Sequence, residues 1–188
     1  TGMMLLAAKM PLDMMISKMS EGMVETLKIF FLTLLFSLPL GLVIAFGRMA
    51  KNRIIRYIVT VYIAIMRGTP LMLQVMAIYF GPNYLLHIRI PRSYRFIAII
   101  VAFALNYAAY FAEIYRSGIE SMPVGQYEAS RLLGYNKAQT FFKIILPQVI
   151  KRILPSITNE VICLVKDTSL AFSIAYLEMF TVAKQIAS

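Results

Sequence analysis

The sequence is poor in the residues that most often carry catalysis or hold metals. It has one cysteine, one histidine and no phosphate-binding loop of the G-x-x-x-x-G-K-[ST] kind. Cys163 has no second cysteine with which to form an internal disulfide, so we interpret it as a small apolar packing residue. His87 is interpreted as a loop residue rather than a ligand. These absences predict a chain with no catalytic residues, no metal site and no nucleotide site of its own.

Polar residues are also too few for an ordinary soluble domain, because 60% of the 188 residues are hydrophobic and the mean hydropathy is +0.72. A bilayer core about 30 Å thick takes about 20 helical residues to cross. We predict three apolar spans and a fourth, more polar one, over residues 26–47, 54–80, 96–112 and 153–165. The predicted fold is all-α, a polytopic membrane helical bundle in which residues 1–188 form a single transmembrane domain.

A cleaved signal peptide is the alternative interpretation of the first apolar run. The run is longer than the apolar region of a signal peptide, and acidic Glu21 and Glu25 precede it in place of a basic tip. We therefore favour a span. The Met-rich segment before it, residues 7–22, is expected to lie flat on the membrane surface.

Basic residues outnumber acidic ones, with 19 Lys and Arg against 9 Asp and Glu and a formal net charge of +10. Nucleic-acid binding is not favoured, because the basic residues collect in short loops beside the spans. These loops hold Arg48, Lys51, Arg53 and Arg56, and then Arg116, Arg131, Lys137, Lys143, Lys151 and Arg152. Short basic loops stay in the cytoplasm, so we predict both regions inside and the N-terminus outside. The opposite loop, with Arg89, Arg92 and Arg95, is either a docking face or simply solvated.

Residues 127–148, YEASRLLGYNKAQTFFKIILPQ, predict a helical hairpin on the cytoplasmic side. Pro123 suits a first helical turn, and Gly134 suits the left-handed position that ends a helix. Asn136 and Gln139 have the spacing of a capping box for the next helix. A simple connection takes only a few residues, so a capped hairpin is predicted to dock into something.

Two further expectations concern the end and the surface of this hairpin. Pro147 is expected to limit the continuation of the second short helix into the membrane. Glu128 and Arg131 are three residues apart and have the spacing of an ion pair on an exposed helical face.

The same segment resembles the EAA loop in the permease subunits of ABC importers. That pattern is Glu-Ala-Ala, three residues, Gly, nine residues, Ile, one residue and Leu-Pro. The chain matches it at Glu128, Ala129, Ser130, Gly134, Ile144, Leu146 and Pro147. Ser130 in place of the second Ala is the one departure. The resemblance implies that residues 122–147 form a cytoplasmic coupling hairpin that sits in a cleft of an ATPase subunit.

Three further segments are similar to the polar-amino-acid uptake permeases: RGTPLMLQ at 67–74, NYAAYFAEIYRSGI at 106–119 and LPSITNEVICLVKDTSL at 154–170. The resemblance implies a subunit of a bacterial inner-membrane importer that holds no cofactor itself. It implies as partners two ATPase subunits that bind ATP and Mg²⁺, a second permease, identical or homologous, an extracytoplasmic solute-binding protein and an amino-acid substrate. ATP binding is expected to move the hairpins and switch the pathway from inward-open to outward-open.

Polar residues within the spans are the candidates for the solute pathway, because ionisable side chains there are costly and face a cavity, a partner or an interface. The candidates are Arg67, Thr69, Gln74, Asn106, Glu113, Glu160, Lys166, Asp167, Thr168 and Ser169. Internal pairing, for example of Arg67 with a carboxylate, is the alternative role. Residues 68–70 are predicted to break the second span and to expose backbone groups to a solute. Glu160 and Asp167 exceed Lys166 by one charge, which favours a polar amino acid, in particular a basic one.

Permeases of this kind usually have five spans, the last of which follows the segment that ends here as TVAKQIAS. We therefore expect a fragment of a longer subunit. An ion-coupled secondary carrier is the first alternative; it would use Glu113, Glu160 and Asp167 as an ion path, but it leaves the hairpin unexplained. A membrane scaffold subunit is the second alternative, and it needs no polar lining.

Overall fold

The computed structural model describes residues 12–87, 91 and 93–174, and every regular element in these ranges is a helix. The all-α prediction is confirmed. The α-helices are α2 (Leu12–Arg48), α3 (Arg53–Gly68), α4 (Leu71–Leu86), α5 (Tyr94–Glu120), α6 (Val124–Leu132), α7 (Lys137–Gln139) and α8 (Leu146–Asp167). A π-helix, η1 (Thr140–Ile145), precedes α8, and a 3₁₀ helix, η2 (Thr168–Ile174), follows it. The loop arginines Arg89 and Arg92 and the segment TVAKQIAS lie outside the described residues.

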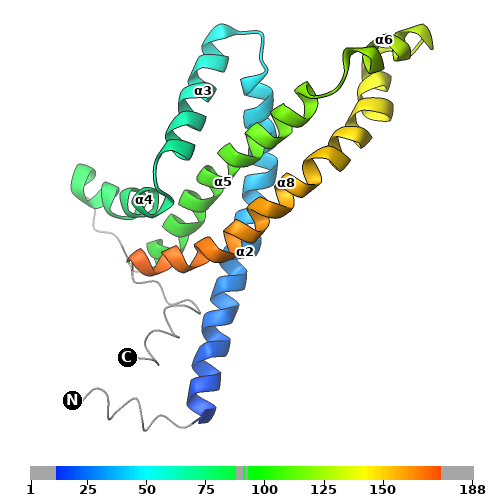
Figure 1. Cartoon of the computed structure of the whole chain (residues 1–188). Coiled ribbons are helices and arrows are strands. Elements are labelled where there is room, and N and C mark those ends of the chain that lie inside the picture. Colours follow the sequence, from blue (N-terminus) through cyan, green and yellow to red (C-terminus); the bar gives the residue numbers. More distant parts are fainter. Residues whose placement is uncertain (1–11, 88–90, 92, 175–188) are drawn as a thin grey trace.

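The molecule has two distinct ends (Figure 1). The turn between α2 and α3 lies at the same end as the hairpin around α6, and the start of α2 lies at the opposite end. The two basic regions predicted to share one side of the membrane therefore do lie at one end of the protein.

Helix α2 runs without a break from Leu12 through the first predicted span to Arg48. No proline stands between residues 12 and 26, so nothing interrupts the propagation of the helix through this stretch. The described part of the Met-rich segment belongs to this long helix, and the expectation of a separate segment lying flat on the membrane surface is wrong.

Small side chains form the interface between α2 and α5. On one buried face of α2 they recur at every fourth position, as Thr33, Ser37, Gly41 and Ala45. A Cβ atom on Gly41 would lie 2.9 Å from the Cβ atom of Phe111 and 3.1 Å from the carbonyl oxygen of Ala108. Small residues let two helix backbones approach closely, which is a main source of helix association in membranes.

The second apolar run, residues 54–80, forms two helices instead of one. Helices α3 and α4 meet at an angle of 107°. Between them Thr69 and Pro70 are extended, with φ/ψ of −116°/144° and −61°/132°. Because a proline disfavours the helical conformation of the residue before it, the helix ends ahead of Pro70. The predicted break at residues 68–70 is confirmed.

Four spans were predicted, and the helices support a smaller number. Among the described residues, α2 and α5 are long and apolar enough to cross a membrane, and the bent pair α3–α4 is a third candidate if it counts as one span. Helix α8 does not reach the same apolar character, because it carries five charged residues: Lys151, Arg152, Glu160, Lys166 and Asp167. The predicted fourth span is a helix, but its composition does not confirm it as a span.

Helices α6 and α7 and the π-helix η1 form the predicted hairpin. Gly134 has a φ of +78°, and Asn136 and Gln139 form the predicted capping box. Pro123 caps α6 from the position before its first residue, instead of standing in its first turn. The expectation that Pro147 limits the second helix is wrong, because η1 continues directly into α8. The wider π turn before Pro147 leaves room for a proline ring that would clash in a regular α-helix.

Gly41→Ala should weaken the packing of α2 on α5, because the new methyl group meets atoms at the α5 backbone that cannot swing aside. Overpacking of this kind costs about 1–3 kcal/mol, so the purified protein in detergent should unfold at a lower temperature. Gly81→Ala on α4 is the matched control, since nothing lies within 4 Å of its added Cβ atom. Equal melting temperatures for the two variants would contradict the close approach.

Candidate functional site

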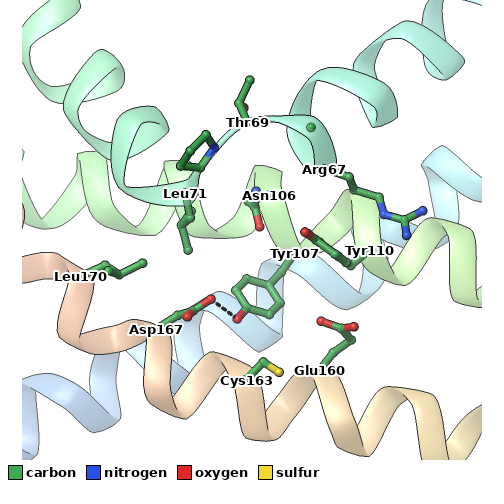
Figure 2. A pocket seen from close by; sticks show the side chains of 12 residues that line it. Arg67, Thr69, Leu71, Asn106, Tyr107, Tyr110, Glu160, Cys163, Asp167 and Leu170 are labelled. Carbon is green, nitrogen blue, oxygen red and sulfur yellow. Dashed lines mark hydrogen bonds between the residues drawn. The ribbon is translucent and has the colours of Figure 1, made fainter.

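A cavity of about 590 Å³ lies where the break between α3 and α4 faces α5 and α8. Figure 2 shows side chains converging on it from all of these elements. They are Arg67, Thr69, Pro70 and Leu71 at the break, Asn106, Tyr107 and Tyr110 on α5, Glu160, Cys163 and Asp167 on α8, and Leu170 on η2. Ligand pockets are commonly about 300–1,000 Å³ in volume, so the cavity has room for a small solute.

Two buried amides hold the break in place. The Nε2 atom of Gln74 donates hydrogen bonds to the carbonyl oxygen of Met66 at 2.9 Å and to the hydroxyl of Thr69 at 2.8 Å. The Nδ2 atom of Asn106 donates to the same Met66 carbonyl at 2.8 Å and to the Oε1 atom of Gln74 at 3.0 Å. The break leaves backbone groups without helical partners, and these amides supply donors to them.

The opposite wall of the cavity is acidic. Asp167 accepts a hydrogen bond from the hydroxyl of Tyr107 at 2.7 Å, which fixes the orientation of its carboxylate. Glu160 lies two helical turns earlier on α8 and points into the same space (Figure 2). Neither carboxylate forms an ion pair within the described part of the chain. Both therefore remain available to a cationic group.

Arg67 supplies the positive charge of the cavity. Its guanidinium carbon lies 5.1 Å from the centre of the Tyr110 ring, a cation–π contact. Internal pairing with a carboxylate, the alternative role considered for Arg67, is not present among the described residues. One guanidinium on one wall and two carboxylates on the other suit a solute that carries both signs of charge.

Some of the predicted pathway residues lie elsewhere. Glu113 accepts a hydrogen bond from Arg116 at 2.7 Å and lies 3.7 Å from Arg48, so it joins α5 to the end of α2. Lys166 is exposed and does not line the cavity. The hydroxyls of Thr168 and Ser169 donate to carbonyl oxygens one turn earlier in their own helical segment, at 2.7 and 2.8 Å.

Tyr107 and Tyr110 are cavity residues that were not among the sequence candidates. Helical spacing was the signal that would have found Tyr110, because Asn106 and Tyr110 are four residues apart and share a face of α5. The same reasoning applies to Cys163, which lies on α8 between Glu160 and Asp167 at spacings of three and four. Its interpretation as a packing residue is incomplete, since it lines the cavity.

The residues of the hairpin pattern separate into exposed and buried sets. Glu128, Ala129 and Gly134 are exposed on the hairpin surface. Ser130 is buried and accepts a hydrogen bond from the hydroxyl of Thr140 at 3.1 Å, which joins the two halves of the hairpin. The remaining three lie where η1 passes into α8: Ile144 in η1 and Leu146 in α8 are half-buried, and Pro147 in α8 is exposed.

The tip of the hairpin is apolar. Leu132 and Leu133 stand at the turn with 90% and 74% of their surface exposed. Beside them, the expected ion pair between Glu128 and Arg131 is absent, since neither residue forms an ion pair within the described residues. Leu132 and Leu133 therefore form a small exposed apolar surface beside two unpaired charges.

The chain has a broken span beside a charged cavity, and this cavity is linked to a capped hairpin. These features define a membrane transport subunit, and comparison with known proteins supports this class. Residues 37–186 match the family described as "Binding-protein-dependent transport system inner membrane component". The L-cystine transport system permease protein TcyB of Bacillus subtilis is 37% identical over 170 residues, which are 90% of this chain and 71% of TcyB. The nopaline transport system permease protein NocM of Agrobacterium fabrum is 37% identical over 177 residues, 91% of this chain and 73% of NocM.

A solved structure, the crystal structure of an amino acid ABC transporter with histidines, superposes with a TM-score of 0.81 at 36% identity, covering 90% of this chain and 78% of that one. The MetNI methionine ABC transporter shares the fold, with a TM-score of 0.69 at 21% identity. The chain therefore belongs to the family of binding-protein-dependent transport system inner membrane components, the permease subunits of ABC importers. This membership favours a permease over the carrier and scaffold alternatives.

Proposed function

We propose that this chain and a second permease, identical or homologous, form the pathway for a polar amino acid with a basic group through a bacterial inner membrane. Two ATPase subunits bind ATP and Mg²⁺ outside this chain, and an extracytoplasmic binding protein delivers the solute. The observation that carries the proposal is the cavity at the broken span, with Arg67 on one wall and Glu160 and Asp167 on the other. Relatives named for cystine, nopaline and glutamine transport support an amino-acid solute.

Each charged group of an amino acid has a partner of opposite charge in the cavity. A guanidinium binds a carboxylate through two parallel hydrogen bonds, so Arg67 is the partner for the α-carboxylate. Glu160 and Asp167 then accept hydrogen bonds from the amino group and from a basic side chain. Tyr107 holds Asp167 in the orientation that faces the cavity. Two carboxylates against one guanidinium leave one negative charge, which a basic solute neutralises.

The orientation follows from the basic loops: the N-terminus lies outside, and residues 48–56 and the hairpin lie in the cytoplasm. A cysteine in place of Lys137, in a Cys163→Ser background, should react with a membrane-impermeant maleimide only after the cells are opened. A cysteine at Asp13, at the other end of α2, should react in intact cells. Reaction of the Lys137 position in intact cells would reverse the arrangement.

The second part of the proposal is that the hairpin couples the pathway to the ATPase. Its exposed leucines would be covered by an apolar partner surface, and in this proposal that surface is the cleft of the ATPase. The hairpin also connects two of the helices that line the cavity, since α5 leads into α6 and η1 leads into α8. A displacement of the hairpin therefore acts on both of them.

Glu160→Gln should raise the solute concentration needed for half-maximal transport by roughly tenfold or more, because a charge-assisted hydrogen bond contributes about 1.5–3 kcal/mol. Transport of a labelled basic amino acid into proteoliposomes measures it. Asp13→Asn, which removes an acid far from the cavity, is the control and should leave transport unchanged. If Glu160→Gln and Asp167→Asn both transport normally, the carboxylates are structural and the solute site lies elsewhere.

Gly134→Val should uncouple the ATPase, because a side chain at a φ of +78° is strained by roughly 1–2 kcal/mol and misdirects the second half of the hairpin. The measurement is ATP hydrolysis by the reconstituted complex with and without loaded binding protein. Gly134→Asn is the matched control, since Asn tolerates the left-handed conformation, and it should retain most of the stimulation. Normal stimulated hydrolysis and uptake in Gly134→Val would show that the turn is only a connection.

A further inference from the structure

A second hollow, of about 280 Å³, lies within the hairpin itself. It is lined by Tyr127, Arg131, Tyr135, Lys137, Thr140 and Phe141. None of these residues belongs to the Glu-Ala-Ala pattern by which the loop resembles its family. The hollow is therefore a feature of this surface for which the pattern does not account.

Hydrogen bonds set the shape of this hollow. The hydroxyl of Thr140 donates to that of Ser130 at 3.1 Å, and Ser130 donates to the carbonyl oxygen of Tyr127 at 2.9 Å. Ser130 and Thr140 are both buried, so these bonds are protected from water. The capping box of Asn136 and Gln139 fixes the backbone on the other side of the turn. The hairpin thus presents a preformed site.

The rim of the hollow is cationic. Arg131 and Lys137 line it, and both are exposed. The Nζ atom of Lys143 lies 5.9 Å from the centre of the Tyr135 ring, which forms part of the wall. No acidic side chain lines the hollow, and none of these three cations forms an ion pair within the described residues. Like charges gathered in this way repel one another unless an anion lies between them.

The walls indicate what kind of anion fits. Tyr127, Tyr135 and Phe141 are aromatic, and they can contact the methylene groups of an acidic side chain while the cations bind its carboxylate. The exposed Leu132 and Leu133 stand at the same turn. An apolar surface next to a cationic hollow complements a protein face that carries an acidic side chain among apolar ones.

We propose that this hollow receives an aspartate or glutamate side chain of the partner ATPase subunit. The inference rests on the proposed coupling function of the hairpin and names the contact through which it acts. Arg131 binds the carboxylate through its two parallel N–H groups, and Lys137 adds a second positive charge. The hairpin is then inserted into the ATPase and also encloses a side chain of it, which allows it to be pulled as well as pushed.

A zero-length cross-link tests the contact directly. In the intact complex, a water-soluble carbodiimide should join the amine of Lys137 to an ATPase carboxylate, and mass spectrometry should identify the linked peptides. Lys137→Arg keeps the charge but removes the reactive amine, so this cross-link should disappear. Lys51→Arg, in the other cytoplasmic loop, is the matched control and should leave it in place. An ATPase cross-link that survives in Lys137→Arg, or none in the parent complex, overturns the proposal.

A binding measurement separates this inference from the coupling proposal. The double variant Arg131→Gln, Lys137→Gln should bind the ATPase roughly tenfold or more weakly, with a smaller dependence on salt than the parent. If the double variant binds with unchanged affinity while Gly134→Val still loses stimulation, the hairpin couples but the hollow is not its carboxylate site. Protection of Lys137 from acetylation by vesicles with anionic lipid, but not by the ATPase, would assign the hollow to a lipid headgroup and likewise overturn the proposal.

Discussion

The carbonyl oxygen of Met66 accepts hydrogen bonds from both Gln74 and Asn106, and the rest of the site depends on this arrangement. A helix that breaks inside an apolar segment leaves backbone groups unpaired, and each costs several kcal/mol in hydrocarbon. The two amides remove that cost at the break, so α3 and α4 can bend by 107°. The bend opens the space that becomes the cavity.

Helix α5 connects the break between α3 and α4 to the rest of the protein. The helix that carries Asn106 also supplies Tyr107 and Tyr110 to the cavity. Its other face packs closely on α2 at Gly41, and its last turn leads into the hairpin. Helix α8 makes a second connection between the hairpin and the cavity, because it begins at the hairpin and carries Glu160 and Asp167 to the cavity. Arg152 on α8 donates hydrogen bonds to Ser121 at the end of α5, which joins the two helices beside the hairpin.

Local features of the chain could be predicted from its sequence. Gly134 and the capping box of Asn136 and Gln139 depend on a few adjacent residues, and both are as expected. The break at residues 68–70 was predictable for the same reason, since Gly and Pro act on their own backbone and that of their neighbours. The all-α fold followed from long apolar runs. Pro147 was misjudged because a π turn compensates for it, and nothing in the local sequence indicated that turn.

Which side chains line the cavity depends on how each helix is rotated about its own axis. The sequence therefore predicted the lining residues only in part. Arg67, Thr69, Asn106, Glu160 and Asp167 were found because charge and polarity within a span are conspicuous. Glu113 has the same chemistry, yet it faces Arg48 and Arg116. Tyr107 was missed because a tyrosine in an apolar helix resembles a packing residue until its hydroxyl is seen to reach Asp167. Which partner a polar side chain meets is a tertiary property.

The central claim is that movement of the hairpin reaches the cavity through α5 and α8. Nitroxide labels at Met72 on α4 and Ile162 on α8, both exposed and outside the cavity lining, span the cavity walls. Pulsed electron resonance on the reconstituted complex, in a Cys163→Ser background, measures their separation with and without a non-hydrolysable ATP analogue. We expect the distance to change on nucleotide binding in the parent hairpin and to stay constant in Gly134→Val. An identical change in both, or no change in the parent, would contradict the claim.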